Sequence, residues 1–265
     1  MDYVSILNIL LDRLLFKTGF SLSVGLELEF YLHGAVGAVE DDFMRHCASL
    51  KIDKEKGLAQ YEFSTPYSSA DCAINTFFSY KEAVCKFAHQ LGLIPDFSSK
   101  PLCSDYGSAA HYHISLHDGE KNIFSDHSIE DNKILRNAID GILAISELSI
   151  PYFMEQEGMK RLVPGFMAPT HISWGKNNRT TMIRIPDSPL KNRRIEFRLP
   201  SPKSNPYKVL TALVVGILYG LDNRAKRIDC TYGNAYDAQY CLQPIIFSST
   251  KLGLFDEILS HYLCS

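Results

Sequence analysis

The feature that most constrains this chain is the regular alternation of charged and apolar side chains in short segments. In GLELEFYL, Glu27 and Glu29 alternate with Leu28 and Phe30. Successive side chains of a strand point to opposite faces, so the two carboxylates share one face and the apolar residues share the other. Carboxylates in such an apolar strand are costly to bury unless a cation neutralises them.

Three further segments carry side chains of the same chemical kind. They are EKGLAQYE, HYHISL and RRIEFRLP, which supply Glu55, Glu62, His111 and Glu196. By the same alternation, His111 shares a face with His113, and Glu196 shares a face with Arg194 and Arg198. Oxygen-rich ligand sets of this kind suit magnesium or manganese. The interleaved arginines suggest that such metals hold a phosphate.

Simpler interpretations exist for each of these residues alone. Glu27 and Glu29 also fit an edge strand with a solvated face, and Arg194 and Arg198 could merely pair with Glu196. Their joint occurrence favours a site. His113 stays open between packing and binding. We expect the remaining partnerless histidines to be structural or exposed; these are His33, His46, His89, His117 and His127.

The motifs together resemble the catalytic domain of glutamine synthetases. The run RLVPGFMAPTHISWGKNNRTTMIRIP at residues 161–186 resembles that family's RLVPG, NRS and IRIP signature. RRIEFRLP followed by NPY, EKGLAQYE and GSAAHYHISL are similar to further family elements, and all stand in the family's order between residues 25 and 222.

The resemblance implies roles for individual residues. It implies one metal ion, Mg²⁺ or Mn²⁺, at Glu29, Glu55 and Glu62, and a second at Glu27, His111 and Glu196. It implies that glutamate is held by Arg161, Arg198 and the backbone at Gly107. The residues implied to handle ATP and the transferring phosphoryl group are His113, Ser115, Arg179, Arg184, Lys191 and Arg194, with Arg179 and Arg184 as the catalytic pair.

The implied activity is an ATP-dependent ligase of nitrogen metabolism that joins glutamate to ammonia or another amine through a γ-glutamyl phosphate. Several positions depart from the family pattern, among them Ala109 and Ala110 in place of Gly-Met. Met167 stands where the family has a flap glutamate that helps to deprotonate the attacking ammonium, and Tyr106 replaces an asparagine that contacts glutamate. A second interpretation therefore stays open: a non-catalytic paralogue that binds nucleotide or glutamate as a regulatory or structural partner.

GLELEFYL begins at residue 25, which leaves no room before it for the family's N-terminal β-grasp domain. In the family that domain completes the neighbouring subunit's site. We therefore expect either a homo-oligomer or a second chain to supply the missing cover.

Composition and periodicity indicate a single globular domain over residues 1–265. The chain is 46% hydrophobic and 22% charged, within the ordinary range for a packed domain. Helices are expected at residues 1–20, 69–92 and 129–150, and a further one from Asn205 as cap with Pro206 in the first turn. Strands and helices without strict alternation predict an α+β fold, an antiparallel sheet flanked by helices.

Charge and cysteine usage bound the partners and the compartment. A net charge of −3 without a long basic run argues against nucleic acid. Seven cysteines without C-x-x-C spacing, such as Cys72 and Cys85, predict reduced, packed thiols and a cytoplasmic protein. The apolar opening contains Asp12 and Arg13 and fits an amphipathic helix, and the run at 209–221 is expected as a buried helix, so no membrane partner is expected.

Overall fold

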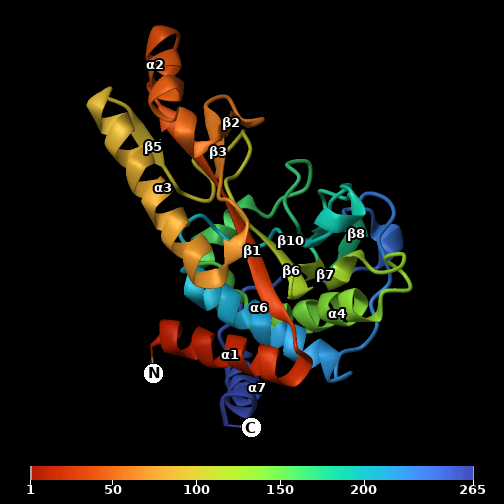
Figure 1. Cartoon of the computed structure of the whole chain (residues 1–265). Helices are drawn as coiled ribbons and strands as arrows, with labels where there is room; N and C mark the ends of the chain where they lie inside the picture. The colour runs from red at the N-terminus through yellow and green to blue at the C-terminus, as the bar shows by residue number, and fades with distance from the viewer. Residues whose placement is uncertain (1, 265) are drawn as a thin grey trace.

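A long strand, β1 (Ser21–His33), runs through the centre of the computed structural model, which describes residues 2–264 (Figure 1). Met1 and Ser265, at the ends of the chain, lie outside the described residues. The strands form one sheet in the order β2 (Ile52–Lys54), β3 (Gln60–Ser64), β1, β6 (Ala110–Asp118), β10 (Ile195–Phe197), β9 (Ile183–Ile185) and β8 (Trp174–Lys176). Three short strands extend it: β4 (Ser68–Ser69) and β5 (Ile94–Asp96) pair with β1, and β7 (Lys121–Asn122) pairs with β6.

The expected α+β fold is confirmed, with one difference in the sheet. Every named pair is antiparallel except β8 and β9, which run parallel. Parallel neighbours normally need a long crossover, but these strands are each three residues long. A return path of roughly 10 Å is enough for strands of that length, so the short loop 177–182 can make it.

The four helices expected from the sequence are present, and the helices also include one near the C-terminus that was not expected. Those longer than ten residues are α1 (Tyr3–Thr18), α3 (Ala70–Gln90), α4 (Lys133–Leu148), α6 (Pro206–Leu221) and α7 (Leu252–Cys264). Two shorter helices, α2 (Ala38–His46) and α5 (Ile150–Phe153), lie between them. Helix α4 begins later than residue 129 because Asn132 caps it, its side chain accepting from the Leu135 amide at 2.8 Å. Asn205 caps α6 as expected, with Pro206 in the first turn.

Helices α4 and α6 cross at close range because glycines line the contact. A Cβ added to Gly220 would lie 1.9 Å from the Asn137 carbonyl oxygen, and one added to Gly141 would lie 2.1 Å from the Gly216 carbonyl oxygen. Helix α6 is buried almost all round, as the apolar run at 209–221 predicted. Residues of both helices belong to the same hydrophobic core as residues of β1 and β6.

The alternation in the strands separates a core face from an open face. Leu26, Leu28 and Phe30 of β1 are fully buried in one hydrophobic cluster with residues of α1, α4 and α6. Glu27 and Glu29 point to the other face and are only partly covered. The edge-strand alternative for this pair is wrong, because β3 lies on one side of β1 and β6 on the other.

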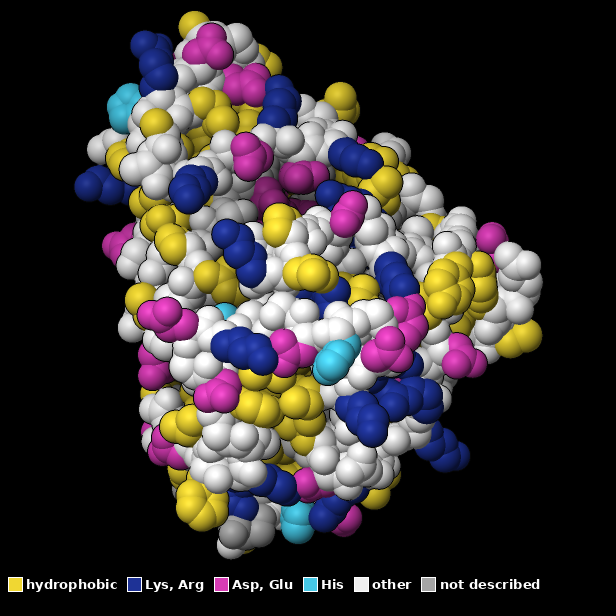
Figure 2. Space-filling view, turned by 45° about the vertical axis from the view of Figure 1, so that its right-hand side comes forward, with side chains coloured by type: hydrophobic (Ala, Val, Ile, Leu, Met, Phe, Trp, Pro, Cys, Tyr) yellow, Lys and Arg dark blue, Asp and Glu magenta, His cyan; other side chains and the backbone are white. Residues whose placement is uncertain are grey.

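Figure 2 shows acidic and basic side chains interspersed over one face, with apolar side chains between them.

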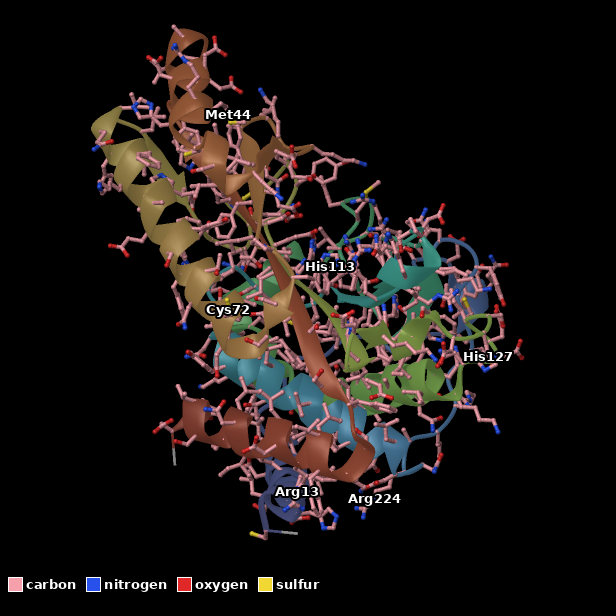
Figure 3. All side chains as sticks on the ribbon, viewed as in Figure 1. Arg13, Met44, Cys72, His113, His127 and Arg224 are labelled. Atoms are coloured by element: carbon pink, nitrogen blue, oxygen red, sulfur yellow. The ribbon has the colours of Figure 1, made fainter. Side chains whose placement is uncertain are left out.

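All seven cysteines, which lie within residues 2–264, are free, but the expectation of packed thiols is wrong for most of them. Cys47 is buried, whereas Cys72 is exposed on the outer side of α3 (Figure 3), since an amphipathic helix also has a solvent face. Among the described residues, no helix is both long and apolar enough to cross a membrane.

Candidate active site

Four adjacent strands bring the predicted ligands together on the open face of the sheet. The register places Glu29 of β1 opposite Glu62 of β3, and Glu27 opposite His111 of β6. On the far side, Glu196 of β10 lies opposite His113. Side chains directly opposite each other on one face are about 5 Å apart at Cβ, so the register alone assembles the cluster.

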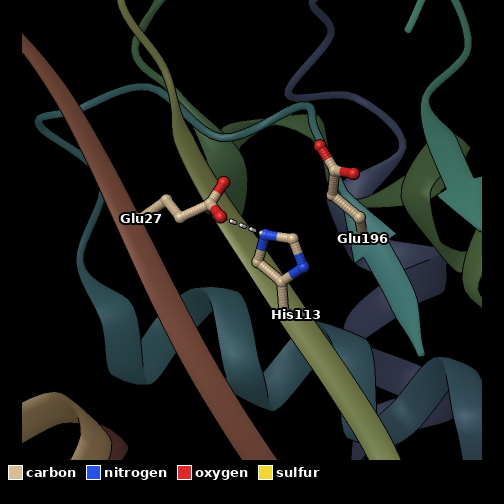
Figure 4. A group of neighbouring side chains, drawn as sticks. All are labelled: Glu27, His113 and Glu196. Carbon is tan, nitrogen blue, oxygen red and sulfur yellow. Dashed lines mark ion pairs between the residues drawn. The ribbon is translucent and has the colours of Figure 1, made fainter. Parts of the chain in front are cut away.

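The shortest contacts converge on Glu27. Its Oε2 lies 3.3 Å from Nδ1 of His111, and its Oε1 lies 2.9 Å from Nε2 of His113 (Figure 4). His111 also lies 3.8 Å from Glu62 Oε2 and 3.9 Å from Glu29 Oε1. Two groups have ligand atoms within 4.8 Å of one another: Glu27, Glu62 and His111, and Glu27, His113 and Glu196.

Glu55 reaches the cluster from the loop between β2 and β3. Its amide donates to the Gln60 carbonyl at 2.8 Å, and its side chain lines a cleft with Glu29 and His111. The partition of ligands into Glu29–Glu55–Glu62 and Glu27–His111–Glu196 stays a prediction. The structure places all six side chains at one site and brings Glu27 against both histidines.

The pKa values of the carboxylates are shifted in opposite directions, according to the charges around each group. Burial raises the pKa of Glu62 well above its usual value, and the charges of Glu27 and Glu29 add to the effect. Burial also raises the pKa of Glu55. For Glu196, burial alone would raise the pKa, but the Arg198 guanidinium and further cations lower it to about 2. We call the carboxylates of Glu27, Glu29, Glu55 and Glu62 the acidic floor. The raised pKa of Glu62 shows that nearby cations do not fully compensate the negative charge of this floor.

Arginines hold Glu196 from both sides. Arg184 Nη1 donates to Oε2 at 2.7 Å and Arg198 Nη1 donates to Oε1. Arg184 is held in turn by the Asn177 side-chain oxygen, at 2.6 Å from its Nη2. Glu196 is thus oriented by charge pairs on a buried strand, and each oxygen keeps a second lone pair for a ligand.

His113 is oriented by an arginine. Arg194 Nε donates to His113 Nδ1 at 2.9 Å. A guanidinium has only donors, so Nδ1 carries a lone pair and the proton of the neutral ring lies on Nε2. A protonated nitrogen cannot coordinate a metal, which favours His111 over His113 as the imidazole ligand.

A cleft of about 500 Å³ lies on the His113 side of Glu27. Its walls include Gly25, Tyr67, Ser115, Lys191 and Arg194. The Tyr67 ring lies against Gly25, where an added Cβ would come within 2.8 Å of ring carbons, so only glycine lets the ring pack there. The volume is in the usual range for a small-molecule site.

A second, narrower cleft lies on the other side of the cluster, where Glu29, Glu55 and His111 meet the segment 166–168. Gly107 lies in its wall, and a Cβ there would come within 2.6 Å of Arg161 Cβ. Tyr106 and Phe166 meet edge to face at 5.4 Å between ring centroids. Arg179 and Arg198 also line this cleft, so the predicted substrate and catalytic arginines lie beside the acidic floor.

Arg161 and Arg198 have tasks that the sequence did not reveal. Arg161 is 3% exposed, and its Nη2 donates to the carbonyls of Arg198 and Leu199 at 2.9 and 2.6 Å. Arg198 Nη2 donates to the Met167 carbonyl at 3.2 Å. Within the described residues, Nε of each arginine is buried without a hydrogen-bond partner, which leaves donors free for a ligand.

Sequence reasoning missed several lining residues. His117 was expected to be structural or exposed, but it lines the larger cleft, and its Nε2 lies 3.0 Å from Ser115 Oγ. The alternation His111, His113, Ser115, His117 along β6 was a signal that could have found it. Tyr67 and Lys56 carried no such signal, because loops placed them. Figure 2 shows acidic side chains in a hollow in the upper half of the molecule with basic ones beside them.

Comparison with known proteins shows which protein family this chain is similar to. Residues 46–243 match the model of the glutamine synthetase catalytic domain. The chain is 35% identical over 163 residues to gamma-glutamylputrescine synthetase PuuA of Escherichia coli (strain K12), a match that covers 61% of this chain and 34% of the relative. It is 31% identical over 250 residues to a glutamine synthetase of Pyrococcus woesei, covering 83% of this chain and 56% of the relative.

Solved structures show the same fold. A chain titled "GmaS/ADP complex-Conformation 1" matches with a TM-score of 0.82 at 23% identity, covering 98% of this chain and 69% of the other. The apo form of the same protein matches with a TM-score of 0.81. This chain spans between about a third and just over half of the length of the two curated relatives described above.

Proposed function

Because this chain belongs to the glutamine synthetase family, through its catalytic domain, we propose that it is an ATP- and magnesium-dependent ligase that joins glutamate to ammonia or another amine. The proposed route goes through a γ-glutamyl phosphate. We further propose that residues 1–265 form one catalytic domain and that another copy or a second chain covers the open clefts.

The observation that carries the proposal is an acidic floor between two clefts. Glu27 lines the larger cleft and His111 lines the narrower cleft, and the two side chains lie in contact where the clefts meet. A phosphoryl group has to pass between two bound molecules in this reaction, and phosphoryl transfer depends mainly on positioning and on cations around the phosphoryl oxygens. The arrangement supplies both requirements.

The residues fit a divalent cation. Glu62 is strongly destabilised as an anion by burial and by its carboxylate neighbours, and a bound cation would remove that penalty. Glu27, Glu62 and His111 offer oxygen and imidazole ligands within 4.8 Å, a set that suits Mg²⁺ or Mn²⁺. When bound, such ions polarise phosphate oxygens and neutralise developing negative charge. We propose two ions, as the family resemblance implies.

The protein's own side chains supply binding and charge. We propose that the larger cleft holds the nucleotide, with Tyr67 as an aromatic surface and Ser115, Lys191 and Arg194 toward the phosphates. We propose that the narrower cleft holds glutamate against the unpartnered Nε atoms of Arg161 and Arg198 and the Gly107 backbone. Arg179 and Arg184 would then stabilise the transferring phosphoryl group.

The test is a purified-protein assay with ATP, Mg²⁺ and glutamate, and with ammonium or hydroxylamine as acceptor. We expect glutamate-dependent phosphate release and formation of the amide or the hydroxamate. Glu27→Gln should abolish both, whereas Glu40→Gln should not, because Glu40 lines neither cleft and pairs with Lys54. Nucleotide binding without any glutamate-dependent turnover would contradict the ligase and support the non-catalytic paralogue, which the methionine at position 167 also favours.

A further inference from the structure

We propose that Lys56 selects the acceptor, favouring amines that carry a carboxylate at their far end, such as amino acids, over ammonium and diamines. This inference rests on the proposed ligase function and names the acceptor class of the same site.

Lys56 lies at the rim of the narrower cleft, opposite the segment 166–168. Its Nζ is 3.2 Å from the Sδ atom of Met167, across the mouth. Lys56 is exposed, whereas the side chains of Glu29 and His111 at the floor are 14% and 5% exposed. A molecule that enters the cleft from solvent therefore passes the ammonium before it reaches the acidic floor.

The contact with Met167 leaves the ammonium available. A thioether sulfur is a weak acceptor and carries no charge, so it neither neutralises Lys56 nor occupies its three donors. Lys56 therefore presents a cationic side chain to a molecule that enters the cleft.

Part of the cleft wall is aromatic. Phe166 packs edge to face on Tyr106, and both residues line the cleft beside Lys56. One ammonium, that of Lys56, thus lies next to an apolar wall, and Glu55 lines the same cleft with His111 and Arg179. An acceptor with a short apolar body and a terminal carboxylate matches this wall and this charge, whereas a second ammonium would meet like charge.

The experiment uses three acceptors of equal carbon number that differ in the charge of the far end: β-alanine, n-propylamine and 1,3-diaminopropane. Amide formation with glutamate is followed by mass spectrometry to give kcat/KM for each. We expect the order β-alanine, propylamine, diaminopropane, with about a two- to fivefold step between neighbours, the size of an exposed charge contact. Lys56→Gln should level the series and Lys56→Glu should invert it.

Lys86→Gln is the matched control, because Lys86 is an exposed lysine on α3. It should keep the wild-type order. The same order in wild type, Lys56→Gln and Lys56→Glu would overturn the proposal while leaving the ligase function intact. Failure of every acceptor, hydroxylamine included, would instead count against the ligase function.

A second measurement tests whether Lys56 contacts the terminal carboxylate, and it does not require catalytic activity. Acetylation of each lysine is mapped by mass spectrometry in the presence of Mg²⁺ and either N-acetyl-β-alanine or N-propylacetamide, which resemble the far ends of two products. N-acetyl-β-alanine should slow acetylation of Lys56 but not of Lys86, and N-propylacetamide should slow neither. Equal acetylation of Lys56 with both compounds would overturn the proposal even for an inactive protein.

Discussion

Arg194 Nε donates a 2.9 Å hydrogen bond to Nδ1 of His113, a contact that joins the residue before β10 to β6 beside the larger cleft. Because the arginine only donates, it selects the ring tautomer whose Nε2–H faces Glu27. One residue therefore orients His113, and the resulting tautomer favours His111 over His113 for the proposed metal-ligating role.

Changing Arg194 to Gln should weaken nucleotide binding. The substitution removes a charged donor from the cleft wall and releases the His113 ring, and a charged hydrogen bond is worth about 1.5–3 kcal/mol, or roughly ten- to hundredfold in Kd. Calorimetric titration with ADP and Mg²⁺ measures the change. Lys121→Gln, which removes an exposed lysine paired with Asp126, is the control. An unchanged Kd in the Arg194 variant would place the nucleotide elsewhere.

Divalent cations should stabilise the fold. At a concentration about 100 times its Kd, a ligand that binds only the folded state adds about 2.7 kcal/mol to the free energy of unfolding. We expect Mn²⁺ or Mg²⁺ to raise Tm in wild type, less so in Glu62→Gln, and fully in Glu40→Gln. Scanning calorimetry that shows no shift with either ion, with or without ATP, would disprove the metal site.

In chelator, the pH dependence of stability should reveal Glu62. Its folded-state pKa is raised, so the native state binds the proton more tightly than the unfolded chain does. The stabilisation from protonated Glu62 is fully present below the ordinary carboxyl pKa of 4.5 and is lost as pH rises through the raised value. Relative to wild type, Glu62→Gln should become more stable as pH increases over this window. Parallel pH profiles of the two proteins in urea denaturation would contradict this.

Restoring a carboxylate at position 167 should change the use of ammonia. Met167 cannot accept a proton, so the wild type should form hydroxamate from hydroxylamine faster than it forms amide from ammonium. Met167→Glu should raise the rate with ammonium by about 100-fold, the lower end of general-base effects, and should also place an anion beside Lys56. Met167→Gln is the matched control without a base. Equal rates with both acceptors in wild type would show that position 167 does not limit the reaction.

Arg161 should be essential to stability whatever its role in binding. Its guanidinium donates to buried carbonyls of the segment that follows β10. Arg161→Lys keeps the charge but loses the fork of donors, and we expect a loss of about 3 kcal/mol in the free energy of unfolding. Lys160, the preceding residue, is exposed, and Lys160→Ala should lower the free energy of unfolding by less than about 1 kcal/mol. Similar urea midpoints for the two variants would refute the structural role.

Two helical glycines, Gly220 at the α4–α6 crossing and Gly253 in α7, should respond in opposite ways to substitution by alanine. Gly220→Ala would put a Cβ 1.9 Å from the Asn137 carbonyl oxygen, so the helices must separate, at a cost of about 1–3 kcal/mol or more. Gly253 lies in α7 with nothing within 4 Å of an added Cβ, and Gly253→Ala should stabilise by up to about 1 kcal/mol. Thermal unfolding of both variants checks the sign of each effect.

Local pattern predicted four of the five long helices, the strand of Glu27 and the chemical kind of the site. Alternation in GLELEFYL predicted that Glu27 and Glu29 face away from Leu28 and Phe30, since strand periodicity is a property of the backbone. Asn205 and Pro206 predicted the start of α6, because helix capping involves only neighbours in the chain. The family resemblance, carried by motifs, assigned the six ligands.

Tertiary structure decided what depends on neighbours distant in the chain. The register that sets Glu27 against His111, the donation of Arg194 to His113 and the task of Arg161 all join segments far apart in sequence. No local pattern encodes which strand lies beside which, or which loop meets another across a cleft. Lys56 and Met167 lie 111 positions apart, so only the packing of the chain could bring the ammonium and the thioether together at the narrower cleft.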